Sequence, residues 1–146
     1  MIFTACRNRF NVYAVKVVSE NGRVGVGYTT ALGSTFNGGT DVNGNKDKCF
    51  EYARKVPGLS GSDKNLLISV LVNTVKHAGT TYMFESQQSG IAFASSYNND
   101  PEVFGGTLRH EAGGHGFAFL ADEYSDANEM PSQDHIDKYT APRITV

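Results

Sequence analysis

The pattern of hydrophobic and polar residues predicts strands and a helix in the first half of the chain. The segment Phe10–Val18 is rich in β-branched and aromatic residues with partial alternation, which predicts a strand. A turn is expected at Asn21–Gly22, and the stretch 29–45, rich in Gly, Asn and Thr, predicts a long loop. Lys46–Val56 has the apolar spacing of a short amphipathic helix.

Longer apolar runs in the second half predict a sheet with one helix on it. Asn65–Thr74 is almost continuously apolar, which predicts a central strand buried on both faces. Residues 80–86 and 90–97 predict two further strands. A helix is expected to follow, with Asp100 as its N-cap and Pro101 at its first position. This order predicts an α/β (α+β) fold with a mixed, twisted sheet.

Length and composition describe an ordinary globular chain. Its 146 residues are enough for one domain, and we interpret 1–146 as a single domain that is part of a longer protein. The stretch after Tyr124 is predicted to be polar and irregular. The net charge of −2 offers no electrostatic reason to expect nucleic acid or an anionic membrane as a partner. No apolar run approaches the roughly 20 residues of a membrane span, and the start lacks the features of a signal peptide.

Two weaker patterns favour structural roles. Cys6 and Cys49 permit one disulfide, but two thiols without a C-x-x-C spacing are predicted to be unpaired. Asp41, Asn43 and Asn45 alternate as in a calcium-binding loop. The glycine and the terminal Glu of an EF-hand do not follow, so a turn is favoured.

The stretch 109–116, "RHEAGGHG", carries the most specific chemistry of the chain. Zinc peptidases of the H-E-x-x-H type place two His one helical turn apart, with the intervening Glu as general base. Here the spacing is H-E-x-x-x-H, from His110 through Glu111 to His115. On a regular α-helix a five-residue step lands about 140° away, so the two imidazoles would point to different faces.

A distorted helix would reconcile this spacing with one shared metal ion. A π-bulge bonds residue i to i+5, and such bulges occur mostly at functional sites. We expect the bulge at Ala112–Gly114, where Gly113 and Gly114 tolerate unusual dihedrals and leave room for close approach. The alternative is a regular helix with Glu111 and His115 as ligands, which leaves no obvious general base.

The spacing alone leaves several candidates for the third metal ligand. Asp122 lies seven residues after His115, about 10 Å along the axis if the helix continued. It reaches the same metal only if the helix ends soon after Gly116 and the chain turns back. We select Asp122, whose other expected role is capping or a bond to an imidazole N–H. The alternatives are Glu123, His135, His77 and a residue outside the chain.

Residues 109–124, "RHEAGGHGFAFLADEY", resemble the signature of the IgA-peptidase family of zinc metallo-endopeptidases, in a form with a doubled glycine. Upstream segments such as "FNVYAVKVVSENGRVG", "TTALGSTF" and "LLISVLVNT" resemble that family in the same order. The resemblance implies a zincin-like catalytic domain from a secreted or envelope-anchored bacterial protein. It implies zinc bound by His110 and His115, with Glu111 as base. Family members usually carry further N- and C-terminal parts, so a truncated catalytic domain is expected.

Two functions from different classes follow. The first is a zinc endopeptidase whose protein or peptide substrate lies extended along an edge strand, either Tyr82–Phe84 or Ile91–Ala94. The second is a non-catalytic module, a degenerate or truncated zincin domain that binds protein or glycan. Metal content and proteolysis together distinguish the two.

Overall fold

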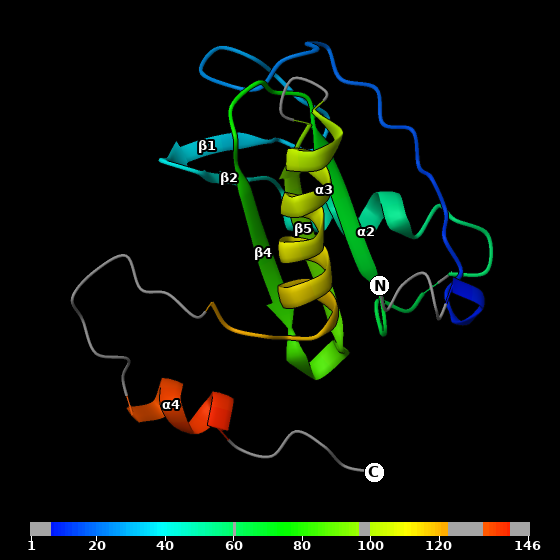
Figure 1. Ribbon diagram of the computed structural model, residues 1–146. Helices are drawn as coiled ribbons and strands as arrows, with labels where there is room; N and C mark the ends of the chain where they lie inside the picture. The colour runs from blue at the N-terminus through cyan, green and yellow to red at the C-terminus, as the bar shows by residue number, and fades with distance from the viewer. Residues whose placement is uncertain (1–6, 60, 97–99, 123–132, 141–146) are drawn as a thin grey trace.

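The chain folds into a small α+β structure of mixed sheets with a 17-residue helix packed on the larger sheet (Figure 1). The larger sheet has the strand order β3 (Leu67–Val72), β5 (Ser89–Ser95) and β4 (Gly79–Phe84). β5 runs parallel to β3 and antiparallel to β4. The computed structural model of the chain describes residues 7–59, 61–96, 100–122 and 133–140.

The central strand is β5, and every one of its residues is buried. The prediction that Asn65–Thr74 is central and buried on both faces is therefore wrong. β3 lies at one side of the sheet, and its Leu71 is 61% exposed while Val70 and Val72 are buried. An apolar run signals burial but cannot say how many strands flank it. The alternative of Ile91–Ala94 as a substrate-binding edge is also wrong, because β5 is paired on both sides.

The hydrophobic core lies between one face of this sheet and the elements that precede it. A helix was predicted over Lys46–Val56, and α2 (Lys46–Ala53) confirms it with an earlier end at its C-cap, Arg54. The predicted loop 29–45 contains an antiparallel hairpin, β1 (Thr35–Gly38) and β2 (Asp41–Asn43). The buried cluster consists of Val42, Cys49, Phe50, Val70, Val72, Ala78, Ile91 and Phe93.

The alternating polar residues near this hairpin have structural roles. The Oδ1 atom of Asp41 accepts a hydrogen bond from Thr80 Oγ1 at 2.9 Å, which ties β2 to β4. Asn45 is the N-cap of α2, and its side chain accepts from the backbone N–H of Lys48 at 2.9 Å. Asp41 and Asn43 thus lie in a strand and Asn45 caps a helix, where the sequence favoured a turn.

No strand forms over Phe10–Val18, so that prediction is wrong. The segment follows a short 3₁₀ turn, η1 (Arg7–Arg9), and has no regular structure. Its side chains include Val12 at 88% and Val18 at 77% exposed. Tyr13 and its neighbours line a shallow hollow with residues 55–57 instead of pairing with a sheet. β-branched residues favour a strand only where a pairing edge meets them.

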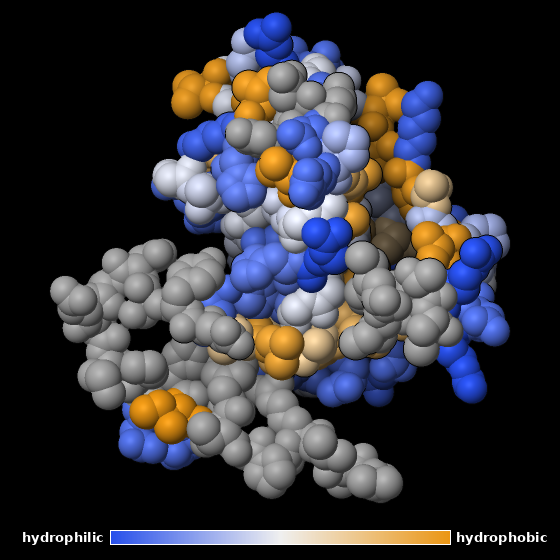
Figure 2. Space-filling view, in the orientation of Figure 1, coloured by the Kyte–Doolittle hydropathy of each residue, from blue (hydrophilic) through white to orange (hydrophobic). Residues whose placement is uncertain are grey.

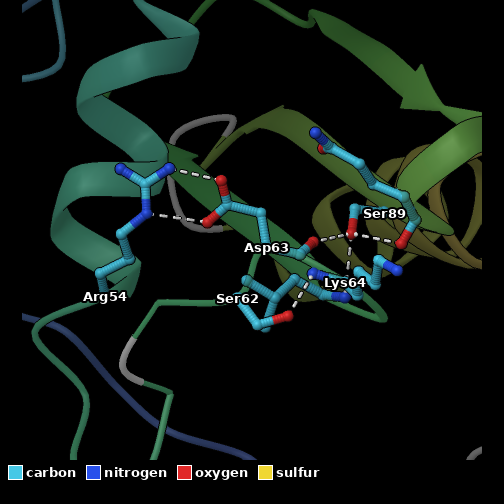
Figure 3. A network of polar contacts seen from close by, with 7 residues as sticks. Arg54, Ser62, Asp63, Lys64 and Ser89 are labelled. Carbon is cyan, nitrogen blue, oxygen red and sulfur yellow. Dashed lines mark hydrogen bonds and ion pairs between the residues drawn. The ribbon is translucent and has the colours of Figure 1, made fainter.

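A polar network ties the start of β3 to the start of β5 and to α2 (Figure 3). Arg54, at the end of α2, forms a two-pronged ion pair with Asp63 in the turn before β3. The Ser89 hydroxyl donates to the carbonyl of Asp63 and accepts from the N–H of Leu66 at 3.2 Å. These bonds set the register of the two strands that support the long helix.

A further helix, α4 (Gln133–Thr140), lies in the stretch after Tyr124, where irregular structure was expected. Its Gln133 Nε2 donates to Asp137 Oδ1 at 2.7 Å, one helical turn away. Local pairs of this kind are hard to detect from hydropathy.

None of the helices in the described ranges has the length and apolarity to cross a membrane. Apolar residues on the face in Figure 2 form separate patches divided by polar residues.

The face of the sheet opposite the core carries the long helix, and small residues let the two approach closely. Ile91 and Phe93 belong to the core, so alternation directs Gly90, Ala92 and Ala94 of β5 toward the helix. A Cβ built on Gly90 would lie 2.6 Å from the carbonyl oxygen of Gly116. The helix backbone therefore rests directly on the central strand.

Substitution of Gly90 with Ala should destabilise the fold. The added methyl would meet backbone atoms of Gly116, which cannot move aside as a flexible side chain can. Such overpacking typically costs about 1–3 kcal/mol of unfolding free energy. Gly114→Ala is a matched control, because a Cβ there meets nothing within 4 Å. Urea unfolding measures both variants, and equal stability of the two would contradict the close approach.

Candidate metal site

The helix that carries the site begins as the sequence predicts. Its first part, α3 (Pro101–Leu108), has Asp100 as N-cap and Pro101 at the first position. The Asp100 carboxylate accepts from the backbone N–H groups of Glu102 and Val103 at 3.0 and 3.1 Å. These bonds satisfy donors that an α-helix leaves free at its start.

The second part is a π-helix, η4 (Arg109–Phe117), which continues α3 without a break. In a π-helix the bonds run from i to i+5, so residues five apart stack one turn apart. His110 and His115 accordingly face each other, with their Nε2 atoms 3.2 Å apart. The predicted distortion is confirmed, and it extends beyond Ala112–Gly114 to nine residues.

The glycines act differently from the expectation. Neither Gly113 nor Gly114 has a positive φ, and a Cβ on Gly114 would meet no atom within 4 Å. The expected close approach is found two residues later, at Gly116, where a Cβ would lie 2.6 Å from Leu67 Cδ1. Gly114 is therefore compatible with the π-helix, but the space around it does not require a glycine.

The chain turns back sharply after the π-helix. The N–H groups of Ala118 and Leu120 donate to the carbonyls of Gly113 and Gly114 at 3.2 and 3.0 Å. Phe119 adopts a left-handed conformation with φ of 55°. This is the reversal that Asp122 needs in order to reach the two imidazoles.

Three potential ligand atoms converge where the chain returns. Asp122 Oδ1 lies 3.1 Å from His110 Nε2 and 3.1 Å from His115 Nε2. Ligand atoms at zinc bond lengths of roughly 2.0–2.2 Å in tetrahedral geometry are about 3.3 Å apart. The observed distances are close to that value, so the group His110, His115 and Asp122 could hold a metal ion.

The orientation of His115 is set by a second hydrogen bond. Its Nδ1 lies 2.6 Å from the carbonyl oxygen of Leu120, which can only accept, so Nδ1 carries the proton. The ring is thereby oriented with Nε2 toward the other two ligand atoms. His115 is the most enclosed of the three, with 11% of its side chain exposed against 45% for His110 and 38% for Asp122.

Glu111 lies beneath this group and faces the sheet. Only 7% of the residue is exposed, and Thr81 Oγ1 donates to its Oε2 atom at 2.7 Å. Burial raises the pKa of Glu111 above its ordinary value, while the Thr81 bond and the imidazoles of His110 and His115 lower it. Asp122 adds a smaller upward contribution to the same pKa.

The other candidates lie apart from the group or outside the described residues. His77 Nε2 is 3.0 Å from the hydroxyl of Thr107 and does not join the three ligand atoms. Glu123 and the side chain of His135 lie outside the described residues, as does Cys6. Cys49 is a free thiol, as predicted, and burial raises its pKa to about 11.

Sequence reasoning missed three contributors to the site. Thr81 binds Glu111, Gly79 leaves space for the Glu111 carboxylate, and the Leu120 carbonyl orients His115. The first two come from β4, far from the motif along the chain, and the third is a backbone group. No local pattern points to such partners.

Comparison of the chain with models of known protein families, with curated proteins and with solved structures finds no match.

Proposed function

We propose that the chain is a zinc endopeptidase with a zincin-like catalytic domain, as its resemblance to the IgA-peptidase family implies. The observation that carries the proposal is the convergence of His110, His115 and Asp122 within one small group. A secreted or envelope-anchored location of the protein is part of the same proposal. The substrate would be a protein or peptide.

The donor set suits a catalytic zinc ion. Catalytic zinc sites use three protein ligands, with nitrogen and carboxylate oxygen among them, and keep a further position open. His110 and Asp122 are partly exposed, so a substrate could approach from the solvent side. Zinc bound there would act as a Lewis acid on the scissile carbonyl and make water a nucleophile at neutral pH.

Glu111 is the residue that we propose as general base. It adjoins ligand His110 in sequence, and its charge interacts with both imidazoles and with Asp122. Its carboxylate, which accepts from Thr81 at Oε2, would take the proton from water and pass it to the leaving amine.

β4 offers an edge for an extended substrate. Gly79 N–H points away from β5 and donates to Thr40 O at 3.1 Å, whereas Ser95 N–H donates to the Ala78 carbonyl. Alternation then directs the backbone groups of Thr81 and Met83 to the same outer edge as Gly79. These groups could pair with the backbone of a peptide laid along β4, beside the helix that carries the ligands. Of the two edges expected from the sequence, this is the one containing Tyr82–Phe84.

Zinc analysis combined with a cleavage assay tests this function. The purified chain is loaded with zinc, dialysed, and incubated with an unfolded protein substrate such as denatured casein. About one bound zinc per chain together with new fragments, both abolished by a chelator, is the expected result. A zinc-loaded chain that leaves every substrate intact would instead favour the non-catalytic binding module.

A further inference from the structure

Thr81 of β4 makes two hydrogen bonds to the same residue of the motif helix. Its Oγ1 lies 2.7 Å from Oε2 of Glu111 and 2.9 Å from the backbone carbonyl oxygen of Glu111. The hydroxyl has one proton, so it donates to one of these acceptors at a time. Both acceptors belong to Glu111, so either hydrogen bond joins the helix to the sheet at that residue.

Gly79, two residues before Thr81, closes the other side of the Glu111 side chain. A Cβ on Gly79 would lie 2.5 Å from Oε1 and 2.7 Å from Cγ of Glu111. Residues two apart on a strand face the same way, so Gly79 and Thr81 form one wall against the carboxylate. The carboxylate is thereby held between the backbone of Gly79 and the hydroxyl of Thr81.

A buried carboxylate needs such a partner. Glu is rarely buried unless it is paired, and Glu111 is 7% exposed. The Thr81 bond holds Oε2 while Oε1 lies against Gly79, so β4 fixes the orientation of the whole carboxylate. A carboxylate that rotated freely would spend less time in the orientation needed for proton transfer, and small misplacements are costly in catalysis.

We propose that Thr81 is a positioning residue that fixes the orientation of the Glu111 carboxylate for proton transfer. This inference rests on the proposed peptidase function. The hydrogen bonds of the Thr81 hydroxyl go to Glu111 and not to His110, His115 or Asp122, so its proposed action is through Glu111.

The chain offers matched variants for a test. Thr81→Val keeps the shape and removes the donor, while Thr81→Ser keeps the hydroxyl. Thr80→Val is the control for losing a threonine hydroxyl from β4, because Thr80 Oγ1 donates to Asp41 on the other side of the sheet. Each variant is zinc-loaded, its zinc content is measured, and kcat and KM are determined on the same peptide.

The positioning role predicts a specific division of effects. Thr81→Val should lower kcat about 10–100-fold, the range found when residues that orient active-site groups are removed, with KM and zinc content unchanged. Thr81→Ser should retain kcat within about threefold. A Thr81→Val variant with unaltered kcat overturns the inference. The inference is also overturned if Thr81→Ser or Thr80→Val lowers kcat as much as Thr81→Val does.

A double-mutant cycle on folding provides a readout that does not depend on activity. With Glu111 present, Thr81→Val should raise the equilibrium constant for unfolding about 10-fold or more, because a buried carboxylate loses its donor. In a Glu111→Ala background the same change should cost less than about threefold. Equal costs in both backgrounds would show that the contact is absent and overturn the inference. Coupling in an inactive wild-type chain would instead overturn the peptidase function and, with it, the positioning role.

Discussion

Glu111→Gln should retain zinc and lose peptide hydrolysis by several orders of magnitude. The amide keeps the size of the carboxylate and can still accept from Thr81, but it cannot take a proton from water. Removing a general base typically costs about 10²–10⁴ in rate, and the coupled activation of water adds to the loss. Turnover of a peptide and zinc content are measured on the same preparation.

The zinc content of this variant separates two roles for Glu111. In the structure, Glu111 lies against Gly79 and Thr81, outside the group of converging ligand atoms. Retained zinc with lost activity is the result that a base gives. Loss of zinc would identify Glu111 as a ligand and would favour the alternative pair Glu111 and His115.

His110→Ala should reduce zinc affinity by more than about 100-fold. Loss of a partner that merely orients a ligand already costs about 10–100-fold in metal affinity, and a lost ligand costs more. His77→Ala is a suitable control, since His77 is an exposed imidazole whose Nε2 lies near Thr107 instead of the metal group. Competition with a chromogenic chelator measures both affinities. Equal affinities in the two variants would mean that His110 does not bind the metal.

Much of the site was predictable from the sequence because its chemistry is local. The spacing of His110 and His115 requires a distorted helix if one ion is shared, and the structure contains that distortion. The capping of the helix by Asp100 and Pro101 is equally local. Asp122 could be named only conditionally, since its place depends on a turn at Phe119 that no motif specifies.

Long-range pairing accounts for the errors. β3 has the more continuous apolar run, yet β5, with its small residues, is the central strand. Small residues there admit the helix backbone, which a hydropathy pattern does not reveal. Phe10–Val18 has strand-forming residues but no paired edge, and its Val12, Val15 and Val18 are exposed. Which strands pair depends on contacts between distant segments, and composition alone does not determine them.

The most direct test of the central claim is zinc K-edge X-ray absorption of the zinc-loaded chain. We expect a first shell of nitrogen and oxygen at roughly 2.0–2.2 Å, with the outer scattering of two imidazole rings. That result would match His110, His115 and Asp122 as ligands. A sulfur scatterer at about 2.3 Å, a single imidazole, or a chain that takes up iron in preference to zinc would contradict the account.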